Sequence, residues 1–155
     1  ALIQEKLYKS GDFTNITFHE YVCDLSYSVF RNFDTGRGKI SLRFDVHPVT
    51  VSMDTAIPCG LILSELLSNV MKHAFPGDRE GEITIVLHRE STDEVLLCIV
   101  DNGIGIPDDF KIEDANSLGL QLAHTIAENQ LKGSLKIEKG NPGTVVSLRF
   151  QHQQF

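Results

Sequence analysis

The sequence predicts an α+β fold, a two-layer sandwich in which a mixed β-sheet of about five strands is covered on one face by about three helices. Three observations support this class. Hydrophobic periodicities follow the order helix, strand, helix, two strands, helix, two strands. Short turn-like segments join the paired strands, which favours hairpins over a doubly wound parallel sheet. The chain has 155 residues, 41% of them hydrophobic, enough for one globular core.

Three segments carry apolar residues at helical spacing: 15–33, about 54–74 and 117–130. The first opens with a capping box formed by Thr17 and Glu20. We expect Asp54 to cap the second helix, whose first turn tolerates Pro58. These are the three helices of the predicted sandwich.

Five segments have the composition of strands: 39–46, 81–90, 93–101, 134–139 and 143–150. Segment 39–46 alternates between apolar and polar residues, which is typical of a half-buried strand. The second and third segments form a hairpin with its turn at 91–93, and the last two flank a turn at 140–143. The charged segment 108–116 is irregular.

The composition excludes several classes of function. A formal net charge of −7 argues against nucleic acid as a partner. The chain has no apolar run of about 18 residues and no signal-peptide pattern, so we expect no membrane contact. Cys23, Cys59 and Cys98 follow no disulfide or metal pattern, which indicates core thiols in a reducing compartment. A cytoplasmic domain is predicted.

The stretch "DNGIGIP" follows an apolar strand that ends at Asp101. Gly103 and Gly105 let the chain turn tightly or approach a ligand closely, although an ordinary strand-to-loop turn has the same pattern. A dinucleotide fingerprint would need glycine at position 108, which is Asp108, and no P-loop triplet occurs in the chain. Any nucleotide would therefore bind in another way.

The second helix carries a polar stripe opposite its apolar arc, formed by Glu65, Asn69, Lys72 and His73. Such a stripe is ordinarily a solvated face, yet its members suit magnesium-triphosphate chemistry. The amide oxygen of Asn69 can complete a magnesium shell without cancelling its charge. Lys72 can neutralise phosphate. Glu65 can orient or deprotonate an attacking group, or hold a metal-bound water.

Four motifs, "ELLSNVMKHAF", "DNGIGIP", "SLGLQL" and "GTVVSLRF", resemble in order and spacing the asparagine box and three glycine boxes of the histidine-kinase ATPase domain. The same superfamily includes type II topoisomerase, heat-shock chaperone and mismatch-repair ATPases. The stretch "AIPCGLILSELLSNVMKHAFP" resembles a sensor-kinase subfamily of bacteria and archaea. The resemblance runs from about Ile57 to Phe150 and implies a Bergerat-type ATP-binding fold.

The resemblance implies ATP and Mg²⁺ as cofactors and assigns roles to residues of the second helix. Asn69 would be the magnesium ligand. Glu65 would be the catalytic or water-orienting carboxylate. Lys72 and His73 would lie near the phosphates.

The glycine boxes carry the remaining implied site. Asp101 would accept a hydrogen bond from the adenine amino group, with Thr144 supporting the base beside it. Gly103 and Gly105 would give the base close access to the backbone. Gly119 would open a helix whose N-terminus faces phosphate.

Two departures from the family pattern concern the expected ATP lid, residues 108–116. Ser117 stands where the second glycine box usually has the first of two glycines. The lid is short, and Phe110 is its only phenylalanine, where many kinases carry a separate phenylalanine-containing box. Both leave the lid geometry and its phosphate contacts open.

The expected domain organisation follows from the resemblance. Residues 11–155 would be the ATP-binding catalytic domain, and residues 1–10 the C-terminal tail of an upstream dimerisation and phosphoacceptor hairpin. The chain begins without methionine in an apparent mid-helix, so we expect a fragment of a longer protein. His19 lies inside the capping box and is not expected to be the acceptor. The other scattered histidines, His47, His88, His124 and His152, are expected in surface or packing positions.

The leading functional hypothesis is the catalytic domain of a two-component sensor histidine kinase. It would transfer the ATP γ-phosphoryl to a histidine on the hairpin of the same or a partner chain, upstream of a response regulator receiver domain. The alternatives are an anti-sigma-factor-type serine kinase of the same superfamily and an ATP-gated binding module. The helical segment before Gly11 favours the first over the second, and Glu65 argues against the third.

Overall fold

The structure is a computed structural model that describes residues 15–33, 39–77, 79–106 and 118–152. The expected hairpin tail 1–10, the lid 108–116 with Phe110, and Ser117 lie outside these residues. The described elements are β1 (Ile16–Thr17), α2 (Phe18–Phe33), β2 (Ile40–Val46), β3 (Thr50–Val51), α3 (Met53–His73), β4 (Gly81–Arg89), β5 (Glu94–Asp101), α4 (Leu118–Asn129), β6 (Ser134–Lys139) and β7 (Thr144–Gln151).

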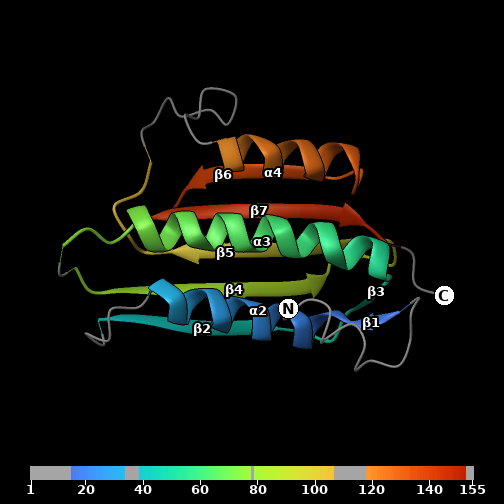
Figure 1. Ribbon diagram of the computed structural model, residues 1–155, viewed down its shortest axis with the longest axis horizontal. Coiled ribbons are helices and arrows are strands. Elements are labelled where there is room, and N and C mark those ends of the chain that lie inside the picture. The colour runs from blue at the N-terminus through green and yellow to red at the C-terminus, as the bar shows by residue number, and fades with distance from the viewer. Residues whose placement is uncertain (1–14, 34–38, 78, 107–117, 153–155) are drawn as a thin grey trace.

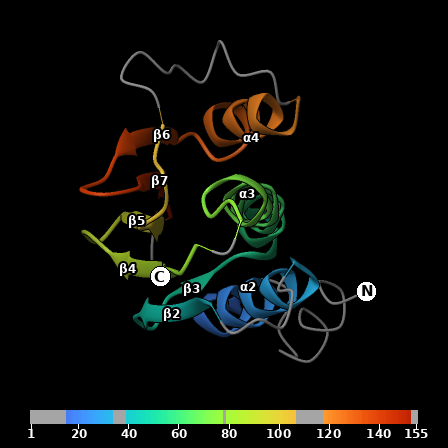
Figure 2. The same cartoon turned by 90° about the vertical axis from the view of Figure 1, so that its left-hand side faces the viewer.

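The described elements form two layers (Figures 1 and 2). One layer is a five-stranded sheet in the order β2-β4-β5-β7-β6, in which β2 runs parallel to β4 and the other neighbours are antiparallel. The helices α2, α3 and α4 all lie on the same face of this sheet, as Figure 2 shows. The predicted α+β two-layer sandwich with a mixed sheet is confirmed.

The hydrophobic core fills the space between the layers. In β4, alternate side chains are fully buried at Ile83, Ile85 and Leu87, because successive residues of a strand point to opposite faces. The predicted apolar arc of α3 faces them: Leu63, Leu66, Leu67, Val70 and Ala74 are buried, and Met71 packs against the core as a partly buried residue. The sequence periodicity therefore identified the inner faces of both layers.

The helix α2 begins at Phe18, directly after the predicted capping residue Thr17, but a short strand that was not predicted precedes it. Residues Ile16 and Thr17 form β1, which pairs with the short strand β3 through Ile16↔Val51 and Thr17↔Thr50. Two-residue strands carry no periodicity, so the sequence could not indicate this ribbon. His19 joins the ribbon to α2, because the backbone N–H of Val49 donates to His19 Nδ1 at 3.2 Å.

The predicted cap of α3 is wrong. The helix begins at Met53, so its N-cap is Ser52, whose backbone is extended at φ −73° and ψ 159°. The Ser52 hydroxyl lies 3.1 Å from the hydroxyl of Thr55 and makes no side-chain cap. Asp54 instead lies in the first turn, where its charge suits the positive end of the helix dipole.

The cysteines are free thiols, with Cys59 and Cys98 buried and Cys23 partly exposed. Cys59 on α3 lies close to Tyr21 on α2. Burial is the main cause of the raised pKa of Tyr21, and Cys59 adds to it. Within the described ranges, no helix combines the length and the apolar character needed to cross a membrane.

Replacing Tyr21 with phenylalanine should raise the free energy of unfolding by about 1 kcal/mol. The Tyr21 hydroxyl is buried and has no hydrogen-bond partner among the described residues, and burial raises its pKa to about 12. Phenylalanine keeps the ring and removes the unsatisfied group. Urea unfolding of Tyr21→Phe tests this. Gly60→Ala is the comparison variant and should lower the free energy of unfolding, because a Cβ at position 60 collides with the Tyr21 hydroxyl. A loss of stability in Tyr21→Phe would contradict the prediction.

Candidate functional site

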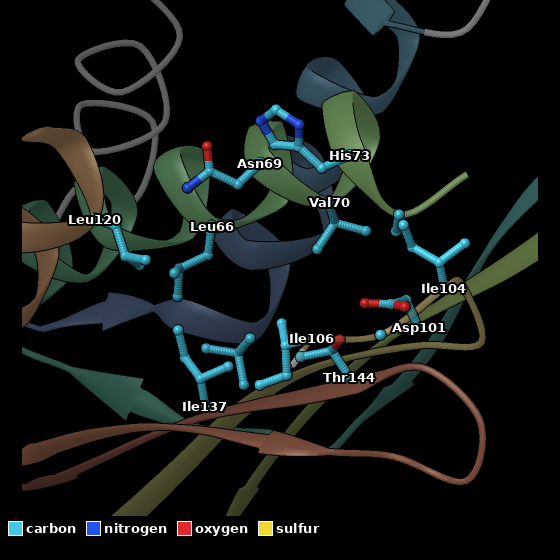
Figure 3. Close-up of a pocket in the computed structure, with 13 residues that line it drawn as sticks. Leu66, Asn69, Val70, His73, Asp101, Ile104, Ile106, Leu120, Ile137 and Thr144 are labelled. Atoms are coloured by element: carbon cyan, nitrogen blue, oxygen red, sulfur yellow. The ribbon is translucent and has the colours of Figure 1, made fainter. Parts of the chain in front are cut away.

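A cavity of about 310 Å³ opens between α3, α4 and the strands β5, β6 and β7 (Figure 3). Its polar lining comes from Asn69 and His73 on α3, Asp101 at the end of β5 and Thr144 at the start of β7. The remaining lining is apolar or glycine: Leu66, Val70, Ala74, Ile104, Gly105, Ile106, Leu120, Ile137 and Val146. A few polar groups in an apolar cleft are typical of a small-molecule site.

Asp101 is the only buried acidic side chain among the described residues, with 3% of its surface exposed. It is the last residue of β5 and lies directly opposite Thr144 of β7 in the antiparallel register. Its Oδ1 accepts a hydrogen bond from the backbone N–H of Gly103 at 2.8 Å. Burial raises the pKa of this carboxyl, and the backbone amides of Gly103 and Thr144 partly oppose that rise. Asp101 is therefore a preorganised acceptor held at an energetic cost.

The turn after Asp101 is tied to α3 and β4. The backbone N–H of Ile104 donates to the carbonyl of Ala74, at the C-terminal end of α3, at 2.9 Å. Asn102 Oδ1 accepts from the backbone N–H of Glu82 in β4 at 2.8 Å. A Cβ at Gly103 would collide with the Ala74 carbonyl. The glycine therefore lets the turn approach α3, which fixes Asp101 relative to that helix.

Gly105 has a different role from Gly103. It lines the cavity, and its φ of +79° lies in the left-handed region that favours glycine. A Cβ at this position would come within 3.1 Å of the Gly143 carbonyl oxygen. Gly105 therefore lines the cavity, whereas Gly103 packs against Ala74.

Only part of the polar stripe of α3 lines the cavity. Asn69 and His73 line the cavity on the side across from Asp101 and Thr144, as Figure 3 shows. Glu65 lies one turn earlier, against the first turn of α4, where a Cβ on Gly119 would collide with its carboxylate. Glu65 and Gly119 are thus neighbours at the α4 side of the cavity without lining it.

Lys72 lies on another side of α3. Its Nζ is 5.6 Å from the centre of the Phe33 ring at the end of α2, and its side chain is exposed. Lys72 and His73 are consecutive residues, which places their side chains about 100° apart around the helix. In this conformation Lys72 does not line the cavity.

Comparison with known proteins identifies the family. The family described as histidine kinase-, DNA gyrase B-, and HSP90-like ATPase matches residues 54–154. The chain belongs to this family. The four boxes quoted above lie within the matched residues, so the resemblance drawn from them is confirmed.

Similar proteins include sensor histidine kinases. The chain is 37% identical over 98 residues to sensor histidine kinase PdtaS of Mycobacterium tuberculosis, which covers 62% of this chain and 19% of that protein. It is 29% identical over 113 residues to blue-light-activated histidine kinase 2 of Erythrobacter litoralis, covering 73% of this chain and 32% of that protein. The chain thus spans a third or less of the length of these curated relatives.

The fold agrees with solved structures of the family. The histidine kinase domain of the Erythrobacter litoralis EL346 blue-light-activated kinase superposes with a TM-score of 0.84 at 25% identity, covering 96% of this chain and 69% of that one. The mycobacterial sensor histidine kinase MprB superposes with a TM-score of 0.72 at 21% identity. The cavity is therefore in an ATPase domain of the histidine-kinase type, whose nucleotide is ATP.

The apolar lining of this ATPase domain is the part that the sequence did not single out. Leu66 and Val70 were assigned to the core arc of α3, and Ile137 and Val146 to ordinary strands. Several of these residues lie within the quoted motifs, yet none was expected to line a ligand site. Apolar residues of a cavity and of a core have the same periodicity, so only the tertiary structure distinguishes them.

Proposed function

We propose that this chain is the ATP-binding catalytic part of a sensor histidine kinase, transferring the γ-phosphoryl of ATP to a histidine on a helical hairpin. The observation that supports this most is Asp101, a buried carboxylate at the bottom of an apolar cavity whose opposite wall carries Asn69 and His73. Similarity to sensor histidine kinases gives the class of acceptor. ATP fits this site because the amino group of its adenine can donate a hydrogen bond to the Asp101 carboxylate.

The proposed roles follow the cavity from one end to the other. Asp101, with Thr144 beside it, accepts from the adenine amino group, and Gly105 and the isoleucines contact the base. His73 lies toward the nucleoside and phosphates, and Asn69 provides a magnesium ligand. A single neutral amide suits Mg²⁺, which takes its other ligands from phosphate and water. When bound, the ion would neutralise phosphate charge during transfer.

Glu65 and Gly119 serve the phosphate end in this proposal. The first turn of α4 provides backbone N–H groups and a positive dipole end toward phosphate. Glu65, next to Gly119, orients the acceptor group or deprotonates it. Lys72 must turn away from Phe33 to reach a phosphate. Catalysis then rests mainly on positioning and charge neutralisation.

The partners complete the proposal. Residues 1–10 are the tail of the dimerisation and phosphoacceptor hairpin, residues 11–155 form the catalytic domain, and a response regulator receiver domain receives the phosphoryl group from the histidine. The protein would act in the cytoplasm, where ATP is available. Nucleic acid and membrane surfaces are not partners of this part of the protein.

Incubation with γ-labelled Mg-ATP and the hairpin of the full-length protein should label the hairpin, and the chain alone should stay unlabelled. Phosphohistidine is lost in acid and survives in base, which distinguishes it from phosphoserine. Acid-stable label on a separate protein would favour a serine kinase. Stoichiometric acid-labile label on the chain alone would contradict the upstream acceptor. ATP binding without transfer to any hairpin or protein would favour an ATP-gated module.

A further inference from the structure

The outer edge of β2 is an open strand edge within the described part of the chain. β2 ends the strand order β2-β4-β5-β7-β6 and pairs with β4 alone among the described strands (Figure 1). The N–H of His47 donates to Leu87 O at 2.8 Å, and the N–H of Gly81 donates to Lys39 O at 2.9 Å. Backbone groups alternate sides along a strand, so odd-numbered residues of β2 bond to β4. The even-numbered residues, Ile40, Leu42, Phe44 and Val46, direct their N–H and C=O groups outward.

The side chains of β2 do little to block this edge. Segment Ile40–Val46 contains neither proline nor glycine, the residues that commonly interrupt an edge strand. Phe44 is 40% exposed, which is unusual for a large aromatic residue on the helix-facing side of a sheet. Arg43 and Asp45 point to the opposite face and have opposite charges. Their side chains are 68% and 67% exposed, and their ion pairs with Glu82 and His47 are weak surface pairs.

The charges select a register for self-pairing. We propose that two copies of this chain associate through antiparallel β2 edges, with the twofold axis at Phe44, forming one sheet continuous across both copies. Phe44 then faces Phe44 of the second copy, and Leu42 faces Val46. Arg43 of each copy lies opposite Asp45 of the other, which gives two attractive cross-strand pairs.

The neighbouring register is less favourable. An axis at Arg43 would overlap the full strands but would place Arg43 opposite its own copy, and like charges directly opposite each other are destabilising. The axis at Phe44 avoids this contact and still matches outward backbone groups with outward backbone groups. An aromatic pair at the axis adds contact area that is exposed in the monomer.

This association is independent of the proposed function. The nucleotide cavity lies between α3, α4 and β5–β7, while β2 is the opposite edge of the sheet (Figure 1). Pairing at β2 therefore leaves both cavities accessible. ATP affinity should be the same in monomer and dimer, so failure of one proposal is distinguishable from failure of the other.

Sedimentation equilibrium of the nucleotide-free chain up to about 1 mM covers the range of weak, small interfaces. We expect a reversible monomer–dimer equilibrium. Arg43→Asp and Asp45→Arg should each raise the dimer dissociation constant at least about tenfold, because each places like charges opposite one another twice. The double variant should restore association to near the wild-type value. Both substitutions are at exposed positions, and thermal melts verify that each of the three variants folds.

Amide exchange measured by NMR identifies the surface. With rising concentration, the amides of Leu42, Phe44 and Val46 should become protected, while those of Arg43 and Asp45 are already protected by β4. A wild-type chain that stays monomeric at about 1 mM would overturn the proposal. So would a double variant as weak as the single ones, or concentration-dependent protection elsewhere in the chain.

Discussion

Asp101→Asn should weaken ATP binding at least about a hundredfold while leaving the fold as stable as the wild type or more so. A hydrogen bond to a charged acceptor is worth about 1.5–3 kcal/mol, and leaving buried polar groups mismatched adds a similar penalty. Together these exceed the roughly 2.7 kcal/mol that a hundredfold change in affinity requires. In asparagine one carboxylate oxygen becomes an NH2 donor, and if the remaining carbonyl oxygen keeps the bond from the Gly103 N–H, that NH2 group opposes the adenine amino group.

The stability half of this prediction follows from the pKa of Asp101. Burial raises the pKa of the carboxyl in the folded protein above its ordinary value. The folded state therefore binds a proton more readily than the unfolded state, and the free energy of unfolding falls as the pH rises through this window. Above it, the ionised carboxylate costs stability. Asparagine keeps the shape without the charge, so Asp101→Asn should lose this pH dependence.

Urea unfolding of both proteins at a series of pH values, together with ATP titration, measures both effects. The wild type should also lose ATP affinity as the pH falls through the raised pKa of Asp101, because the protonated carboxyl is a poorer acceptor. A large loss of stability in Asp101→Asn would show that the carboxylate is structural. Unchanged ATP affinity would remove Asp101 from the site.

The same residue should decide between nucleotide bases. Guanine presents a carbonyl oxygen where adenine presents an amino group, so a fixed carboxylate attracts one base and repels the other. GTP should bind the wild-type chain at least about a hundredfold more weakly than ATP. Asp101→Asn should remove most of this preference. Equal affinity of the wild type for the two nucleotides would contradict the adenine assignment.

Asn69→Ala should abolish phosphotransfer to a supplied hairpin, with a change in the free energy of unfolding below about 1 kcal/mol. Asn69 lies on the cavity side of α3, outside the buried apolar arc, so its truncation opens no core cavity. The loss would come from the magnesium ligand that the proposed mechanism requires.

Ser68→Ala is the matched control for Asn69→Ala. Ser68 is the preceding residue of α3, is similarly half-buried and does not line the cavity. We expect it to keep phosphotransfer near the wild-type rate. Thermal melts without nucleotide complete the comparison. A much lower melting temperature for Asn69→Ala than for Ser68→Ala would indicate a structural role for Asn69, and retained phosphotransfer would exclude it as the metal ligand.

The sequence by itself determined the architecture and the polar end of the site. Periods of two and of about 3.6 residues reveal which side chains are buried, so five strands, three helices and their inner faces could be predicted. Asp101 was identifiable because an apolar strand stops at an acidic residue followed by alternate glycines. Both signals are local along the chain.

The tertiary structure decided which side chains meet. Gly103 leaves room for Ala74, and Glu65 lies against Gly119. The sequence could not indicate these contacts, because they join segments that are far apart along the chain. Helical periodicity places Lys72 on the same stripe as Asn69, yet in the structure the Lys72 ammonium group lies over the Phe33 ring at the end of α2. The apolar cavity wall could not be separated from the core, since burial by a neighbouring helix and burial by a ligand select the same side chains. The packing of α3 and α4 against the sheet decides which apolar side chains line the open cavity and which are covered by the core.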